Sequence, residues 1–222
     1  MINAAVVGLG WWGRHIIERL NGPDAPMRVI ATVDPDPRAE ATYASIDAVL
    51  DDDDIDAVIL CTPNTLHASQ AQRCAAAGKH VMCEKPLALT AVDAAAIVDA
   101  SRKAGVVLAV GHERRFEIAM REAHDRIASG ELGTVLHAEA AFSHDKFRGL
   151  TSDHWRGSLA EAPAAGMTAM GVHLTDLLIW MLGPVTSVFA SVRHRVLPLP
   201  TGDVVAVHLE FESGTVAAMN SI

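Results

Sequence analysis

Three glycines near the start of the chain have the spacing of a loop that can hold phosphate groups. Residues 8–13 read GLGWWG, directly after a short apolar run and before a helical pattern. Gly8 permits a tight turn, Gly10 lets the backbone approach a pyrophosphate, and Gly13 lets the helix pack closely on the strand. The N–H groups and the positive dipole at the start of that helix favour a bound anion. The alternative is a glycine turn that holds no ligand.

A carboxylate downstream of the loop favours a dinucleotide site over a chance glycine turn. Asp34 follows the apolar run at residues 29–33, where it would accept hydrogen bonds from the ribose hydroxyls of an adenosine and repel a 2′-phosphate. The pattern therefore predicts NAD rather than NADP, a preference that Arg38 nearby weakens slightly. The predicted dinucleotide contacts in this region are Gly8, Gly10, Trp11, Trp12, Gly13 and Asp34, with the tryptophans interpreted as packing residues of the loop.

The tripeptide Glu84-Lys85-Pro86 stands at the exit of another apolar run, residues 80–83. Doubly wound folds bind ligands at the carboxyl ends of their strands, so this is a suitable place for reactive side chains. Taken alone, however, the tripeptide is also typical of an ordinary strand exit with a solvated lysine. Its significance depends on what accompanies it in the rest of the chain.

The elements that would position these residues follow a βαβ pattern through the first half of the chain. The apolar runs are continuous rather than alternating, as expected of strands buried on both faces of a parallel sheet. We therefore predict an α/β domain of the Rossmann type over residues 1–112. The expected strands are 4–7, 29–33, 57–61, 80–83 and 106–110, and the expected helices are 12–20, 45–50, 66–77 and 91–104.

After residue 112 the pattern predicts a second, α+β domain over residues 113–222. Helical patterns are followed by strand-like segments that are separated by short turns, which favours an open, mostly antiparallel sheet. The expected elements are a charged helix at 114–129, a half-exposed strand at 135–143, a loop at 144–166, a helix at 167–182, and strands at 185–193, 204–211 and 215–221.

Several motifs occur in an order that is more specific than any one of them. They are GLGWWG at 8–13, CTPNTLH at 61–67, EKP at 84–86, GHERRF at 111–116, WR at 155–156 and GVHLTD at 171–176. With them the chain resembles the Gfo/Idh/MocA oxidoreductases over nearly its whole length. The resemblance implies a Rossmann domain followed by a domain with an open, mostly antiparallel sheet. It also implies NAD(P)-dependent oxidation or reduction of a sugar, polyol, cyclitol or related hydroxyl or carbonyl compound.

The resemblance also implies roles for single residues. Lys85 would hydrogen-bond the reacting oxygen, where alkoxide charge develops, and Pro86 would follow the cis peptide bond often found in this motif. His173 would be the acid or base that exchanges the hydroxyl proton; the alternative is a helix histidine with a structural hydrogen bond. Further cofactor contacts are expected at Thr62, Pro63, Asn64, His67, Glu84 and Lys85, and substrate contacts at Arg115, Trp155, Arg156 and Asp176.

One position departs from the family's pattern. The family commonly has an aspartate four residues before the histidine, whereas this chain has Ala169. Asp176 follows His173 by three residues and could reach it sterically, but the family has an aspartate there as well. Three interpretations remain open: Lys85 and His173 suffice, the substrate class differs, or the protein is a non-catalytic NAD-binding sensor. A further alternative uses NAD transiently, for elimination or glycoside cleavage through a keto intermediate.

The helix predicted at 167–182 separates a core-facing stripe from the face that carries the candidate site. Helical periodicity places Ala169, His173, Asp176 and Trp180 together on one face. The opposite, apolar stripe consists of Met167, Met170, Gly171, Leu174, Leu178 and Met181.

Two differences in length accompany the change at Ala169. The segment at 34–55 is shorter than usual, so the helix after the second strand should be reduced. The chain also ends where family members continue, and we expect a short or C-terminally truncated member. Because the chain stops directly after a strand, we expect its sheet to be covered by another copy, in a homodimer or tetramer.

The composition bears on the partners, the metal content and the cellular compartment of the protein. The chain has 222 residues, is 50% hydrophobic and carries a net charge of −9, which argues against nucleic acid or an anionic membrane as a partner. We expect no metal site, because the acidic run at 51–54 lacks calcium-loop spacing and His112, His144 and His154 lack tight ligand spacing. Three cysteines, no signal peptide and no membrane-spanning run predict a cytoplasmic protein without disulfides.

Overall fold

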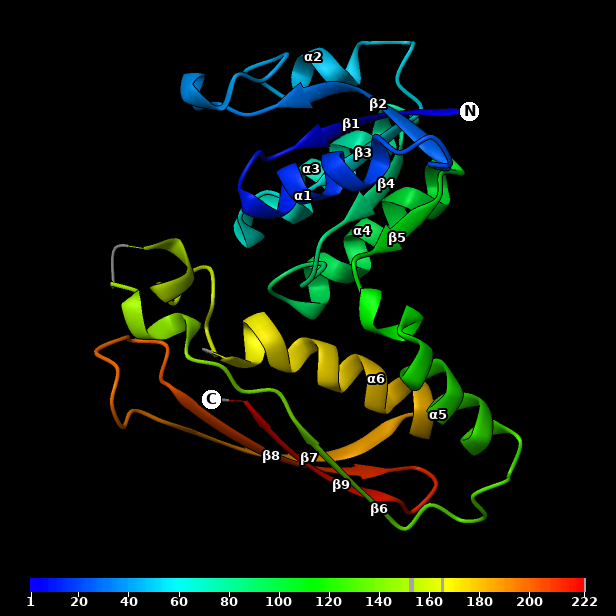
Figure 1. The fold of residues 1–222 in the computed structure, drawn as a ribbon, viewed down its shortest axis with the longest axis vertical. Coiled ribbons are helices and arrows are strands. Elements are labelled where there is room, and N and C mark those ends of the chain that lie inside the picture. Colours follow the sequence, from blue (N-terminus) through cyan, green and yellow to red (C-terminus); the bar gives the residue numbers. More distant parts are fainter. Residues whose placement is uncertain (152–153, 165, 222) are drawn as a thin grey trace. The chain divides into compact units, whose positions relative to one another are not determined.

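The computed structural model describes residues 1–151, 154–164 and 166–221, so a small part of the loop predicted at 144–166 lies outside the described residues. The chain divides into two compact units, Met1–Gly111 and His112–Ile222. Figure 1 shows helices around a parallel sheet in the first unit and helices against a second sheet in the other. Each unit has its own hydrophobic core.

The first unit is built on the parallel strands β1 Ile2–Val7, β2 Met27–Val33, β3 Ala57–Leu60, β4 His80–Cys83 and β5 Leu108–Val110. Their order in the described sheet is β2-β1-β3-β4-β5. All four residues of β3 are buried, as expected of a central strand covered on both faces. Parallel pairing sets Val7 beside Leu60 and Leu60 beside Cys83. The loops that follow β1, β3 and β4 therefore leave the sheet at one edge.

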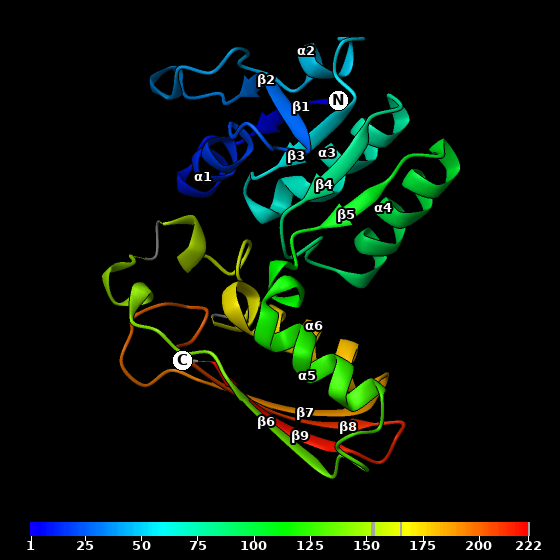
Figure 2. The same ribbon diagram turned by 45° about the vertical axis from the view of Figure 1, so that its right-hand side comes forward.

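The helices of the first unit are α1 Trp11–Leu20, α2 Asp47–Leu50, α3 Asn64–Ala76 and α4 Ala91–Ala104. They lie on both faces of the sheet (Figure 2). On β1, Ala4 and Val6 pack in one core cluster with residues of α1, whereas Ala5 and Val7 pack in another with residues of α3 and α4. This division follows from the two-residue period of a strand. The single turn of α2 agrees with the short segment noted between the second and third strands.

The second unit holds the strands β6 His137–Ala141, β7 Val185–Arg193, β8 Val204–Phe211 and β9 Val216–Ser221. Their order is β6-β9-β8-β7, with β6 parallel to β9 and the other pairs antiparallel. Burial alternates along β8, as in a sheet that is covered on one face only. The predicted fold class, a parallel Rossmann sheet followed by an open and mostly antiparallel sheet, is confirmed.

One face of this second sheet is covered by helices. Leu174 and Leu178 of α6 Val172–Leu182 pack against the buried residues of β8 and β9. On the opposite face, Phe189 of β7 pairs with the exposed His208 of β8 and is itself 71% exposed. The sheet is therefore open on that face in the described chain. No helix of the described residues is both long and apolar enough to cross a membrane.

The helix predicted at 114–129 is interrupted. A 3₁₀ helix covers Glu113–Phe116, Glu117 is extended with φ −65° and ψ 134°, and α5 then spans Ile118–Ala128. Glu117 begins α5, because its carbonyl accepts the N–H of Arg121 at 3.0 Å. The sequence does not reveal such a break, because no proline or glycine marks it.

The helix predicted at 167–182 begins with a π-helical turn, Met167–Gly171, before α6 continues it. The wider turn changes the angular position of each residue, so the predicted apolar stripe is only partly right. On the face predicted to carry the candidate site, His173 is buried. On that side α5 packs against α6, and the rings of His124 and Trp180 stack with centroids 4.0 Å apart. Of the predicted stripe, Met167, Leu174 and Leu178 pack in the core. Leu182, which lies outside the predicted stripe, packs there as well.

Candidate active site

The glycine loop joins β1 to α1, and each of its glycines meets a different constraint. Gly8 has φ +93°, and a Cβ there would lie 2.7 Å from the carbonyl oxygen of Cys61. A Cβ on Gly13 would lie 2.0 Å from the carbonyl oxygen of Gly8, so only glycine lets α1 approach the loop this closely. A Cβ on Gly10 would meet nothing within 4 Å. The space beside Gly10 is therefore open, as a site for a pyrophosphate requires.

Two tryptophans open α1 directly after Gly10. Trp11 is 74% exposed and its ring lies 5.4 Å from that of Trp12, between centroids. Trp12 in turn packs on His15, at 5.3 Å between centroids. The indole Nε1 of Trp12 is buried, and no described residue accepts a hydrogen bond from it. The two tryptophans thus pack beside the loop, in agreement with the interpretation of the sequence. The indole N–H of Trp12 is in addition a buried hydrogen-bond donor at this place.

Asp34 ties the glycine loop to the end of β2. Its Oδ2 accepts the N–H of Leu9 at 2.8 Å, and its Oδ1 accepts the N–H of Asp36 at 2.9 Å. Each carboxylate oxygen keeps a further lone pair for a ribose hydroxyl. Arg38, the residue that could favour a 2′-phosphate, is paired with Asp36 at 2.7 Å, and its hydrogen bond lowers the pKa of that carboxyl to about 2. These residues therefore fit NAD.

His67 is buried in the first turns of α3 and fastens two of the loops at the sheet edge. Its Nδ1 lies 2.8 Å from the carbonyl oxygen of Pro86, and its Nε2 lies 3.0 Å from that of Thr62. Because both partners are acceptors, both contacts are hydrogen bonds only when both ring nitrogens carry a proton. Both ring nitrogens thus face backbone groups of the loops, and the side chain holds the EKP segment against the segment after β3.

The EKP segment leaves β4 beside the end of β5. The peptide bond between Lys85 and Pro86 is cis, as the resemblance implied. Glu84 is buried, and its Oε2 accepts the N–H of Lys85 at 3.2 Å. Its carboxylate packs on Gly111, where a Cβ would lie 2.6 Å from Oε1. Lys85 is half-buried at the carboxyl edge of the sheet, which is the edge that carries the glycine loop.

The thiols behind these loops belong to the core. Cys83 is fully buried and Cys61 is half-buried, and both are free cysteines. Burial, followed by the nearby Glu84 carboxylate, raises the pKa of Cys83 to about 12. The same two causes hold the pKa of Cys61 far above its ordinary value. Both thiols stay protonated at neutral pH and are poor nucleophiles.

In the second unit, Asp176 is held by an arginine from the 3₁₀ helix before α5. Arg115 donates from Nε to Oδ2 at 2.7 Å and from Nη2 to Oδ1 at 2.5 Å. The same Oδ2 lies 3.7 Å from Nδ1 of His112. The hydrogen bond to Asp176 raises the pKa of Arg115. Both were predicted as substrate contacts; the structure brings them together as a bidentate pair.

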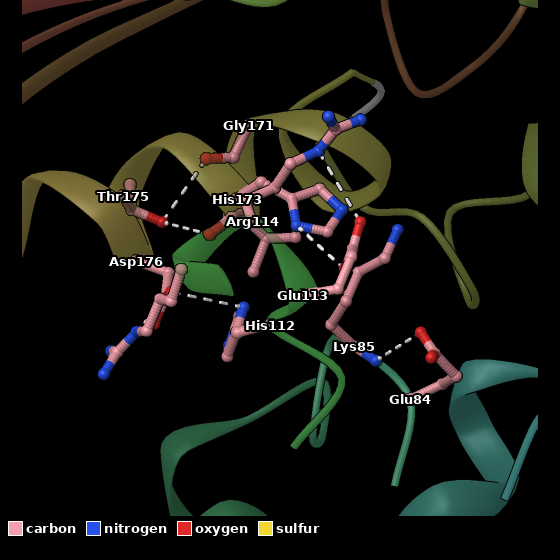
Figure 3. A network of polar contacts seen from close by, with 11 residues as sticks. Glu84, Lys85, His112, Glu113, Arg114, Gly171, His173, Thr175 and Asp176 are labelled. Atoms are coloured by element: carbon pink, nitrogen blue, oxygen red, sulfur yellow. Dashed lines mark hydrogen bonds and ion pairs between the residues drawn. The ribbon is translucent and has the colours of Figure 1, made fainter. Parts of the chain in front are cut away.

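His173 lies one turn before Asp176 on α6, and its side chain is only 4% exposed. Its Nδ1 is 3.7 Å from Oε2 of Glu113. Figure 3 shows the two side chains facing each other. The proposed substitute for the missing carboxylate, Asp176, is instead engaged with Arg115. Glu113 was missed in the sequence, where the only signal is its place inside the GHERRF motif.

The remaining predicted substrate residues share a turn of their own. Trp155 and Arg156 lie in the 3₁₀ helix Trp155–Gly157, and the guanidinium of Arg156 lies 4.2 Å from the centroid of the Trp155 ring. No described contact joins them to Asp176 or His173. His144 packs on Phe147, with ring centroids 5.1 Å apart. Within the described ranges, no three His, Cys, Asp or Glu side chains form a metal-binding group.

The fold and the glycine loop define an α/β protein of the dinucleotide-binding class. Two family models match the chain: the oxidoreductase family with an NAD-binding Rossmann fold at residues 2–112, and the GFO/IDH/MocA C-terminal domain at residues 120–221. The chain belongs to the Gfo/Idh/MocA family of oxidoreductases. The predicted family and its cofactor, NAD, are thereby confirmed.

Individual relatives agree with the family. A 1,5-anhydro-D-fructose reductase of Ensifer adhaerens is 35% identical over 79% of this chain and 53% of its own. An inositol 2-dehydrogenase of Saccharopolyspora erythraea is 30% identical over 96% of this chain and 64% of its own. The crystal structure of the WlbA dehydrogenase from Bordetella pertussis, with NADH and UDP-GlcNAcA, matches with a TM-score of 0.90 at 26% identity, over 99% of this chain and 66% of that one. The chain thus spans about half to two thirds of the length of these relatives.

Proposed function

We propose that the chain transfers a hydride between NAD and the carbinol or carbonyl carbon of a sugar, polyol, cyclitol or related compound. The observation that carries the proposal is the half-buried Lys85 at the sheet edge that also carries the open glycine loop. A cation at that edge can stabilise oxyanion charge beside a bound nicotinamide. The names of the relatives, a reductase and dehydrogenases, favour catalysis over a non-catalytic NAD sensor.

In this proposal, bound NAD supplies the hydride acceptor, and the chain's own residues do the rest. The N–H groups at the start of α1 bind the pyrophosphate and Asp34 binds the adenosine ribose. Lys85 hydrogen-bonds the reacting oxygen of the substrate, which stabilises the alkoxide character that develops there. His173 takes the hydroxyl proton during oxidation and returns it during reduction.

We also propose that the protein assembles as a homodimer or tetramer through the open face of the second sheet. Phe189 lies exposed on that face, among polar and small residues that a second copy could cover. We further expect no nucleic-acid or membrane partner, because the net charge is −9. The free, buried Cys74 and Cys83 are compatible with a reducing cytoplasm.

The proposal is tested by incubating the purified protein with NAD and a panel of polyols, sugars and cyclitols while following absorbance at 340 nm. We expect NADH to form with at least one compound, and Lys85→Met to lose this activity while it still binds NAD through the glycine loop and Asp34. A protein that binds NAD but gives neither NADH nor any product with the panel would contradict the proposal. A product without net NADH would instead support transient use of the cofactor.

A further inference from the structure

We propose that Glu113 is the proton-transfer partner of His173 and supplies the carboxylate that is missing at Ala169. In this role it stabilises the protonated His173 ring and passes the ring's proton on to solvent. The inference rests on the proposed function, because it concerns the proton that oxidation of a hydroxyl group releases.

The two oxygens of the Glu113 carboxylate face different partners (Figure 3). Oε2 lies 3.7 Å from Nδ1 of His173, and Oε1 lies 3.5 Å from Nε of Arg114. Arg114 is itself held in place, because its guanidinium carbon lies 5.1 Å from the centroid of the Phe142 ring and its Nη1 binds Glu117. The carboxylate of Glu113 is therefore oriented toward His173 on one side and toward a fixed cation on the other.

His173 and Glu113 differ in how far their side chains are exposed to solvent. The His173 side chain is 4% exposed, whereas that of Glu113 is 45% exposed. A buried imidazole has no direct route for its proton to bulk water, and a half-exposed carboxylate beside it provides one. The distance of 3.7 Å exceeds a direct hydrogen bond, so transfer requires one bridging water or a small rotation of the carboxylate.

Two neighbouring titratable side chains, Asp176 and His112, face partners of their own. Asp176, one turn further along α6, binds Arg115 through both oxygens. The ring of His112 meets that of His173 edge-on, with centroids 6.3 Å apart, and its Nδ1 faces Asp176. Glu113, in contrast, faces the His173 ring directly.

During the oxidation of a secondary alcohol, the proton and the electron pair of the substrate go to different acceptors. The substrate O–H bond breaks and its proton goes to Nε2 of His173, while the C–H bond breaks and its electron pair passes with the hydrogen to NAD. The carbon is oxidised to a carbonyl and NAD is reduced to NADH. The proton on Nδ1 of His173 then passes to Oε2 of Glu113 and on to water. Each turnover releases one proton and leaves His173 neutral with its remaining proton on Nε2. Before the next oxidation, Nε2 gives this proton to water that enters when the product leaves, and Nδ1 regains a proton through Glu113, which restores the starting tautomer.

The pairing is tested without substrate by NMR titration of the His173 ring, assigned with His173→Gln. We expect Glu113→Gln to lower the titration midpoint of His173 by about 0.5–1 pH unit, because a nearby carboxylate favours the imidazolium. Glu122→Gln is the matched control: it removes a carboxylate that pairs with Arg126 on α5, and it should leave the midpoint unchanged. An unchanged midpoint in Glu113→Gln, with both variants folded by circular dichroism, would overturn the pairing.

The proton transfer is tested with any compound that the wild-type protein oxidises. We expect Glu113→Gln to lower kcat by about 10–100-fold, with an unchanged Kd for NAD, and added imidazole buffer to restore the rate in a saturable way. Glu113→Asp should retain more activity than Glu113→Gln. A loss that no buffer restores, or no loss at all, would overturn the relay. If the wild type oxidises nothing, the proposed function fails, and the NMR titration still decides the pairing.

Discussion

Replacing Gly10 with alanine should affect the binding of NAD without destabilising the fold of the glycine loop. Gly10 has φ −64° and ψ −175°, which any L-residue adopts, and its added Cβ would meet nothing within 4 Å. The free energy of unfolding should therefore stay the same or rise by up to about 1 kcal/mol, since alanine restricts the unfolded chain. The variant should fold normally.

The binding of NAD should respond in the opposite way. The open space beside Gly10 is where we place the pyrophosphate, and a methyl group there pushes the phosphate away from the backbone N–H groups. Each hydrogen bond to a charged group contributes roughly 1.5–3 kcal/mol, so losing one raises the Kd for NAD by about 10–100-fold. The Kd can be measured by isothermal titration calorimetry, and independently by energy transfer from Trp11 and Trp12 to NADH.

Gly13→Ala is the contrasting variant. Its Cβ would lie 2.0 Å from the carbonyl oxygen of Gly8, and this backbone atom can move only with β1 or α1. We expect a lower Tm together with weaker NAD binding. The reasoning is refuted if Gly10→Ala binds NAD as tightly as the wild type, because the pyrophosphate then does not lie against Gly10.

Two further predictions concern the second unit. Asp203 accepts the N–H groups of Arg195, Val196 and Leu197 at 2.8, 2.6 and 2.8 Å, so Asp203→Asn should lower the free energy of unfolding by about 1–3 kcal/mol in urea titrations at pH 7. These hydrogen bonds, led by that from Leu197, lower the folded-state pKa of Asp203. The stabilisation is therefore fully present above the unfolded pKa of about 3.9 and fades as the pH falls through the folded value. A difference in stability between wild type and variant that persists undiminished in strong acid would contradict this origin. Phe189→Glu, on the exposed face of β7, should convert the proposed oligomer to monomers in light scattering while Tm changes little, and an unaltered oligomer mass would place the interface elsewhere.

The sequence predicts most of the fold because the relevant signals are local. The run AVIL of β3 is continuously apolar and entirely buried, and the alternation along β8 matches a sheet covered on one face. The glycine spacing likewise depends only on short-range geometry: Gly8 needs its positive φ and Gly13 its close approach within one loop. Such features are set within a few residues and can be recognised without the rest of the structure.

The parts that were missed depend on contacts between distant segments. Arg115 binds Asp176 across 61 positions of the chain, and that pairing excludes Asp176 as the partner of His173. Glu113 reaches His173 only because the segment before α5 packs beside α6. The π-helical turn at Met167–Gly171 leaves no mark in an apolar pattern that continues through it. Residue type and spacing identified the candidates, but not the partner of each one.

Transfer of deuterium tests the central claim most directly. The protein is incubated with NAD and a mixture of C-deuterated polyols, sugars and cyclitols, and the recovered nicotinamide is analysed by mass spectrometry for net transfer of deuterium. We predict deuterium at C4 of the nicotinamide with the wild type, and none with Lys85→Met although that variant still binds NAD. If the wild type binds NAD and no deuterium enters the nicotinamide, the chain makes no net hydride transfer from this class of substrate to NAD, and the claim is contradicted.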